Sequence, residues 1–194
     1  MKNFVTRSAA AFALLAMLLS ITSPVTAQSG YRTNLGIVAV APLTAAETQT
    51  LQFMREEEKL ARDVYQQLYQ KWNLTVFQNI SAAEQTHFDA IGVLLTRYGV
   101  ADPAQANAAG VYTDVNLIAL YNEVLAKGMK SAQDALEAGA LIEKKDIADL
   151  EAAIPATSKL DVKRVYTNLL NGSFNHLEAF ESMCEVVTAG VPAL

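Results

Sequence analysis

The chain has 194 residues and a formal net charge of −5 at neutral pH, with 20 acidic residues against 15 lysines and arginines. Because the basic residues form no cluster, this balance argues against binding to nucleic acid or to an anionic membrane surface. The single cysteine, Cys184, excludes an internal disulfide, so we expect stability to come from helix packing. A disulfide between two copies, and a homodimer, are left open.

The first 27 residues have the features of a secretory signal peptide. Lys2 and Arg7 give a basic start, residues 9–19 form a nearly unbroken apolar run, and cleavage is expected after Ala27. The run is shorter than the ~20 apolar residues that span a membrane, and no later segment approaches that length. Removal of residues 1–27 takes away two basic residues and no acidic one, which leaves 167 residues with a net charge of −7. We expect one soluble, exported domain, periplasmic or secreted, with no membrane anchor after cleavage.

The chain after the leader begins with a segment that does not look helical. Residues 28–43 contain two glycines, a proline and the short apolar run Ile37–Val40, and we expect an extended arm. Thr44 and Glu47 then have the spacing of a capping box, in which each side chain bonds to the other residue's backbone N–H. This pair predicts the start of a helix that runs to about Trp72.

Glycines and a proline divide the rest of the chain into further helices and their connections. These helices are expected at about 75–98, 114–127, 131–154 and 161–187. Gly99, Gly128 and Pro155 end the first three of them, and residues 99–113 form a long crossover. The pattern requires no strand. It predicts an all-α domain over residues 44–187, a bundle of four long helices with one short extra helix in the crossover, followed by a tail at 188–194.

Each long helix has an apolar stripe that is interrupted near its middle by residues able to bind a metal. The interruptions, in chain order, are Glu58, then Glu84 with His87, then Glu143, and finally His176. A carboxylate or imidazole in a core position must be paired, protonated or bound to metal. Because each interruption is near the middle of its stripe, a bundle would bring all of them to a similar depth. Four helices that each contribute such a residue are typical of two-metal carboxylate sites.

Each of these residues also has a simpler interpretation. Glu58 belongs to a highly charged run that could be a solvated face, with Arg62 as its i,i+4 partner. Glu84 could belong to a capping box begun by Ser81, and Glu143 could be exposed beside two lysines. The two histidines could be ordinary core residues that are satisfied by hydrogen bonds. The joint pattern favours a metal site over these separate readings.

Four segments resemble a family of prokaryotic ferritin-like proteins catalogued as a domain of unknown function, with a more distant similarity to rubrerythrin-type di-iron bundles. They are Met54-Arg55-Glu56-Glu57-Glu58-Lys59-Leu60-Ala61-Arg62-Asp63-Val64-Tyr65, Glu84-Gln85-x-His87, Glu143-x-x-Asp146-Ile147-x-Asp149-Leu150 and Asn175-His176-Leu177-x-Ala179-Phe180. The similarity covers about residues 48–182. It implies a ferritin-like four-helix bundle, whose known relatives bind two iron ions.

The last helix departs from the di-iron pattern. Bundles of this type usually have Glu-x-x-His there, whereas this chain has Ser173 three residues before His176. Asp146, one turn after Glu143, is the expected substitute ligand or a residue that orients one, and Glu57 is a weaker candidate. Gly172 either bends the helix at the site or allows a close helix contact.

Three tyrosines have a phase that could place them beside the site. Tyr65, Tyr98 and Tyr166 could donate hydrogen bonds to ligands, although core packing with the hydroxyl group toward water is the simpler interpretation.

The sequence therefore predicts a metalloprotein with two iron ions, or manganese as the next choice, bound by Glu58, Glu84, His87, Glu143 and His176 with help from Asp146. Its partners would be metal ions and small oxidants, and its reaction oxidation of ferrous iron or reduction of peroxide, so an oxidoreductase is one outcome. The alternative is a metal-free or weakly metallated bundle that acts as an interaction module of the cell envelope through its N-terminal arm.

Overall fold

A computed structural model describes residues 41–189, which form an all-α structure without strands. Its five helices are α1 (Ala45–Trp72), α2 (Thr75–Tyr98), α3 (Val115–Gly128), α4 (Ala132–Ala156) and α5 (Leu160–Thr188). The predicted signal peptide, residues 28–40 of the predicted arm and residues 190–194 of the predicted tail lie outside the described residues. Within residues 41–189, no helix combines the length and the apolar character that crossing a membrane requires.

The helix ends follow the capping chemistry of the sequence. Thr44 and Glu47 form the predicted capping box at the start of α1. Asn73 and Gly99 end α1 and α2 in the left-handed conformation, which these two residue types adopt more readily than others. The prediction that Pro155 ends the fourth helix at Ile154 was wrong by two residues, because α4 continues to Ala156. A proline this close to a helix end removes only one hydrogen bond of the last turn.

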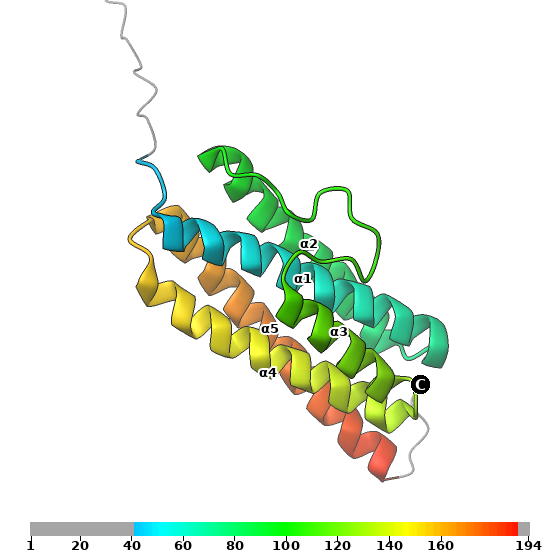
Figure 1. Ribbon diagram of the computed structural model, residues 1–194. Coiled ribbons are helices and arrows are strands. Elements are labelled where there is room, and N and C mark those ends of the chain that lie inside the picture. Colours follow the sequence, from blue (N-terminus) through cyan, green and yellow to red (C-terminus); the bar gives the residue numbers. More distant parts are fainter. Residues whose placement is uncertain (1–40, 190–194) are drawn as a thin grey trace, which may run out of the picture. The chain divides into compact units, whose positions relative to one another are not determined.

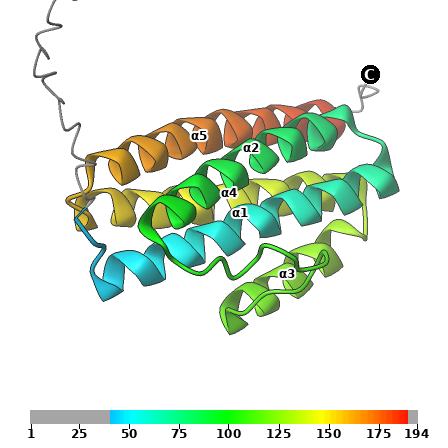
Figure 2. The ribbon, with the colours of Figure 1, turned by 90° about the horizontal axis from the view of Figure 1, so that it is seen from above.

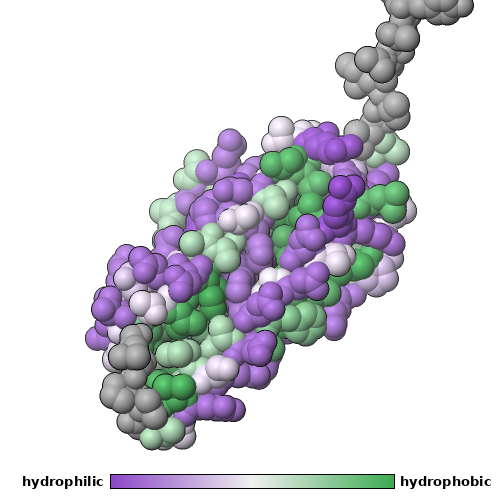
Figure 3. Space-filling view, turned by 180° about the vertical axis from the view of Figure 1, so that it is seen from behind, coloured by the Kyte–Doolittle hydropathy of each residue, from purple (hydrophilic) through white to green (hydrophobic). Residues whose placement is uncertain are grey.

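The long helices form two antiparallel pairs that lie against each other. Short connections join α1 to α2 and α4 to α5, and each pair packs along its length. In addition α1 contacts α4, and α2 contacts α5. The short helix α3 lies against α1 and α4 on one side of the long helices, as Figures 1 and 2 show. On the face shown in Figure 3, hydrophilic residues predominate, with apolar patches between them.

The charged run on α1 is buried, which corrects the interpretation of this segment as a solvated face. The connection between α2 and α3 covers it and takes its hydrogen bonds. Arg55 pairs with Asp102 at 2.8 Å, and Lys59 donates to Asp63 and to the carbonyl of Ala108. The Glu56 carboxylate accepts from the backbone N–H and the hydroxyl of Thr113 and from the next N–H. These bonds hold the crossover and the start of α3 against α1.

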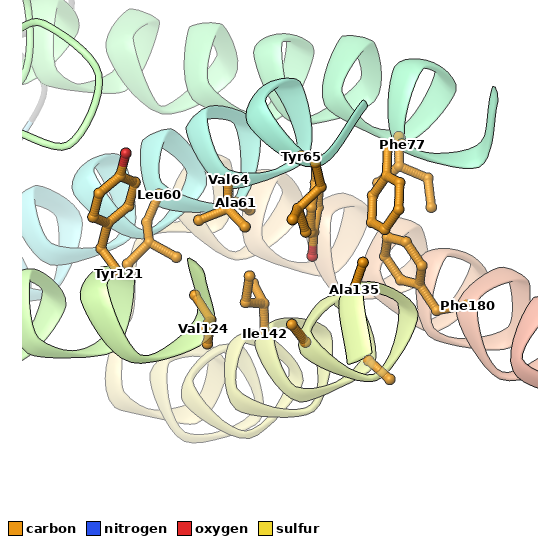
Figure 4. Packing of buried hydrophobic residues seen from close by; sticks show 14 of the residues in the cluster. Leu60, Ala61, Val64, Tyr65, Phe77, Tyr121, Val124, Ala135, Ile142 and Phe180 are labelled. Carbon is orange, nitrogen blue, oxygen red and sulfur yellow. The ribbon is translucent and has the colours of Figure 1, made fainter. Parts of the chain in front are cut away.

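Two apolar clusters fill the interior, one toward each end of the long helices. The first is built around Tyr65, Phe77 and Phe180, whose rings lie 5.1–6.1 Å apart (Figure 4). The second contains Met54, Ile91 and other residues of the opposite end. On each long helix a short polar stretch separates the residues of one cluster from those of the other. The interior therefore has a polar layer between two apolar ones.

Candidate metal centre

The polar layer contains all the metal-binding candidates of the sequence analysis. In chain order they are Glu58 from α1, Glu84 and His87 from α2, Glu143 and Asp146 from α4, and His176 from α5. The four glutamate and aspartate carboxylates are at most 6% exposed, and His176 is 9% exposed. Because the apolar stripes place these residues at one level, side chains from four helices converge.

Glu84 lies between two groups of potential ligands. Glu58, Glu84 and His87 form one group, and Glu84, Glu143 and His176 form the other, each with its ligand atoms within 4.8 Å of one another. The Oε2 atom of Glu84 is 2.9 Å from Nδ1 of His87, and its Oε1 atom is 2.8 Å from Nδ1 of His176. The two imidazole rings are stacked with their centres 5.5 Å apart. One carboxylate thus offers an oxygen to each of two adjacent positions.

The same side chains have most of the unsatisfied polar atoms in the described part of the protein. Eight buried side-chain nitrogen or oxygen atoms lack a hydrogen-bond partner there, and seven of them belong to the polar layer: both oxygens of Glu57 and one atom each of Glu58, Glu84, His87, Asp146 and His176. The ring nitrogens approach carboxylates closely, but without the N–H···O alignment of a hydrogen bond. Buried polar groups in native proteins are rarely left unpaired, so this concentration fits a cation-binding site.

The layer also has more negative than positive charge. Five carboxyl groups are buried here, those of Glu57, Glu58, Glu84, Glu143 and Asp146. The facing basic groups are the two histidines and, at the edge, Lys145. Even with both rings protonated, the fully ionised cluster would keep an excess of negative charge. With both rings neutral, as metal ligands must be, two divalent cations would offset most of the five negative charges.

The pKa values show how the cluster limits its charge through protons. Burial and the charge of Asp146 raise the pKa of Glu58, and burial with the charge of Glu84 raises that of Glu143 to about 8. Burial also raises the pKa of Asp146, to about 7. Burial alone would raise the pKa of Glu84 too, but the adjacent His176 and His87 hold it at about 2.

Both histidines are held in the protonated form by their carboxylate neighbours. Burial lowers the pKa of His87, but Glu58 and Glu84 outweigh it and bring the value to about 11. Burial likewise lowers the pKa of His176, which Glu143 and Glu84 raise to about 9. Metal ligands must be deprotonated, so a cation bound here would displace these protons.

Ser173, the residue that departs from the di-iron pattern, is in direct contact with Asp146. Its hydroxyl donates to Oδ2 of Asp146 at 2.5 Å and lies 3.0 Å from the carbonyl of Leu169. The Oδ1 atom of Asp146 has no partner. Asp146 is thus adjacent to the position that a carboxylate occupies in the usual pattern. Glu57, the weaker candidate, is also buried, and burial together with the charge of Asp146 raises its pKa.

Gly172 makes room for the ring of His87. A Cβ atom at this position would lie 2.6 Å from Cε1 and Nε2 of His87. The helix α5 continues through Gly172 without interruption, so the close-contact interpretation is the one that fits. The sequence alone could not indicate which residue of α2 would fill the space.

Of the three tyrosines, Tyr65 reaches the layer. Its hydroxyl donates to Oε1 of Glu143 at 2.6 Å, while its ring packs in the apolar cluster of Figure 4. The core packing is as expected, but the hydroxyl is buried against Glu143 rather than directed toward water. The hydroxyl of Tyr98 donates to Asp161 instead, and Tyr166 packs in the second apolar cluster.

The contacts in the structure contradict the simpler interpretations of Glu58, Glu84 and Glu143. Ser81 cannot begin a capping box, because α2 starts at Thr75 and the Ser81 hydroxyl donates to the carbonyl of Gln78. Arg62 pairs with Asp63 and Gln85 rather than with Glu58. Glu143 is 1% exposed, since it points inward while the neighbouring lysines lie at the surface.

The fold and the cluster together define an all-α protein with a buried carboxylate–histidine layer. Residues 47–190 match the sequence pattern of a family described as "Uncharacterized protein domain (DUF2202)". The chain belongs to this family. The resemblance to a domain of unknown function is therefore confirmed, while the ferritin-like character and the similarity to rubrerythrin stay predictions.

Both the sequence and the fold also have a named relative. The uncharacterized protein MJ0754 of Methanocaldococcus jannaschii is 49% identical over 142 residues, which are 73% of this chain and 77% of the relative. The crystal structure of hypothetical protein MJ0754 from Methanococcus jannaschii DSM 2661 has a TM-score of 0.74 at 47% identity and matches 78% of this chain and 85% of its own.

Proposed function

We propose that the four long helices form a ferritin-like four-helix bundle whose polar layer binds two divalent metal ions. The observation that carries this proposal is the position of Glu84, which belongs to both ligand groups and offers one oxygen to each. A bridging carboxylate between two cations is the arrangement that such bundles build from facing helices. Glu58 and His87 would complete one position, and Glu143 and His176 the other.

Asp146 is proposed as an additional ligand that compensates for Ser173. Its buried, unpartnered Oδ1 atom and its contact with the Ser173 hydroxyl support this role. Tyr65, which donates to Glu143, would hold that ligand in one orientation. The donor set of carboxylates and imidazoles fits iron first and manganese next.

Two such ions, when bound, supply redox chemistry with dioxygen, peroxide or ferrous iron. The protein's own residues would bind and orient the ions, accept their charge and exclude bulk water. We propose oxidation of ferrous iron or reduction of peroxide as the reaction. We further propose that the protein is exported to the periplasm or secreted, on the basis of the basic and apolar composition of residues 1–27. A homodimer is compatible with this proposal.

The test is anaerobic titration of the metal-free protein with Fe(II), followed by exposure to dioxygen or peroxide. The wild-type protein should bind about two equivalents per chain and then consume oxidant, whereas Glu84→Ala should bind almost none because both positions lose a ligand. Glu181→Ala removes an exposed carboxylate paired with Lys144 and serves as the control. Equal binding by Glu84→Ala and Glu181→Ala would contradict the proposal.

The second candidate is a metal-free bundle that acts as an interaction module. The contact between Ser173 and Asp146 favours it, because it satisfies one buried carboxylate oxygen without a cation. Under this alternative, Glu58→Ala and His87→Ala should leave function intact and raise stability, since unpaired buried groups are removed. Under the metal proposal, the same two variants should lose metal binding.

A further inference from the structure

Glu57 is a buried carboxylate that neither proposed metal position uses. It is 2% exposed, and neither of its oxygens has a hydrogen-bond partner. Within residues 41–189 its nearest opposite charge is the ammonium group of Lys145, 3.6 Å from its Oε1 atom and beyond hydrogen-bond distance. Such a group is costly unless it is protonated or a cation neutralises it.

Lys145 marks the place where that cation would lie. Its ammonium group contacts Oδ2 of Asp149 as well as Glu57, so a single positive charge there faces carboxylates from α1 and α4. The lysine is 37% exposed, which allows its flexible side chain to move out into solvent. Asp146, one turn before Asp149 on α4, is also buried, and its charge contributes to raising the pKa of Glu57.

An open cavity borders this position, with Asp149, the partner of Lys145, in its wall. It has a volume of about 660 Å³ and lies between α1, α4 and the residues before α3. Three carboxylates are part of its wall, those of Glu56, Asp114 and Asp149. Asp149 thus lies both in the wall of the cavity and, through Lys145, beside Glu57, which directly precedes the inner ligand Glu58. A cleft lined with one sign of charge raises the local concentration of the opposite ion.

We propose that Glu57 and Asp149, assisted by Asp146, form an outer divalent-cation site through which metal ions reach the inner layer, and that Lys145 closes this site when no metal ion is there. This inference rests on the proposed function of the inner layer. It adds a route from the α1–α4 face, a third and weaker position on that route, and a basic residue that competes with the metal ion for it.

The experiment is rapid-mixing measurement of Co(II) uptake by the metal-free full-length protein, followed by absorbance, with the bound metal counted after equilibrium dialysis. Glu57→Gln should bind as many equivalents as the wild type, but at least about tenfold more slowly, because the attraction along the route is lost. Glu181→Gln makes the same change of charge at the surface of α5 and should keep the wild-type rate. Asp149→Asn, at a more exposed position, should also slow uptake.

Lys145→Met gives the complementary result. Without the competing ammonium group, it should bind one equivalent more than the wild type, whereas the control Lys144→Met should not. Equal rates for Glu57→Gln and Glu181→Gln, or no additional equivalent in Lys145→Met, would overturn the outer site and leave the inner centre standing. Loss of an equivalent in Glu57→Gln would make Glu57 an inner ligand and also overturn the outer site. A wild-type protein that binds no Co(II) would overturn both proposals.

Discussion

Glu84 links the two halves of the proposed centre because it is the residue common to both ligand groups. Its two oxygens approach the two histidines at 2.9 and 2.8 Å, and it lies at the middle of the apolar stripe of α2. A carboxylate buried to this extent is destabilising unless positive charge surrounds it. In the polar layer that positive charge comes from imidazolium rings or from metal ions. In either case His87 and His176 must lie beside Glu84, as cations themselves or as ligands of the metal ions.

Gly172 provides a test of how closely His87 must be positioned. Alanine in place of glycine within a helix usually stabilises it by about 1 kcal/mol, but here the new Cβ atom would lie 2.6 Å from the imidazole ring. Gly172→Ala should therefore remain folded and bind Mn(II) at least about tenfold more weakly, as displaced ligands do. Isothermal titration of the metal-free protein measures this.

Gly139→Ala is the matched control for that variant. Its new Cβ atom would press on the ring of Phe180 in the apolar cluster, at 2.8 Å, so it should lower the melting temperature and leave Mn(II) affinity unchanged. If the two variants lose the same affinity, Gly172 has no specific relation to the site.

Tyr65 provides a test of the polar layer without any metal. Tyr65→Phe keeps the ring in the apolar cluster but removes the hydroxyl that donates to Glu143, so a buried acceptor loses its partner. We expect a loss of about 1–3 kcal/mol in the free energy of unfolding, measured by urea denaturation of the metal-free protein. Tyr98→Phe removes a hydroxyl from the more exposed Asp161 and should cost less. If the two variants lose the same free energy of unfolding, the bond from Tyr65 to the polar layer contributes no more than an exposed hydrogen bond, which would contradict this prediction.

At the scale of the helices, local chemistry made most of the structure predictable. The capping box of Thr44, the left-handed residues Asn73 and Gly99, and the alternating apolar stripes indicated all five helices and most of their ends. The same stripes indicated which polar residues would meet in the interior. These signals lie within one or two turns of a helix, so they can be read without a partner.

What could not be predicted depends on contacts between distant parts of the chain. The run Arg55–Lys59 consists of charged residues only, and such a run, taken alone, is typical of a solvated face. Its burial follows from the crossover, which contacts α1 about 47 to 58 residues further along the sequence. The space at Gly172 and the contact between Ser173 and Asp146 likewise depend on which helices are neighbours. The spacing of residues along one helix does not indicate which other helices will be its neighbours.

The ends of the helices also give a prediction about acid stability. A hydrogen bond from Thr157 and the bond from the Thr44 backbone lower the pKa of Glu47 from 4.5 to about 2. Since the pKa is lower in the folded protein, the stabilisation is complete above about pH 4.5 and is lost as the pH falls toward 2. Glu47→Gln should therefore be less stable than the wild type at pH 7, by about 1 kcal/mol or less for so exposed a residue.

Urea denaturation of both proteins at pH 7 and near pH 2 measures this difference directly. The two proteins should approach the same stability near pH 2. A difference that stays constant across this range would show that the carboxylate charge is not responsible.

At the scale of the whole molecule, the interior is organised around its polar layer. Two apolar clusters supply the packing, and the layer between them contains five carboxyl groups that no hydrophobic contact requires. Replacing such groups by apolar ones often stabilises a protein, so their presence points to a function rather than to folding. The chain belongs to the DUF2202 family, and its proposed activity is based on the geometry of this layer.

The most direct measurement is a crystal structure of the protein grown with Mn(II), with anomalous difference maps calculated at a wavelength where manganese scatters strongly. We expect two inner peaks on either side of Glu84, one contacting Glu58 and His87 and the other contacting Glu143 and His176. A single peak, or peaks only at surface carboxylates with the layer unchanged, would contradict the two-metal centre.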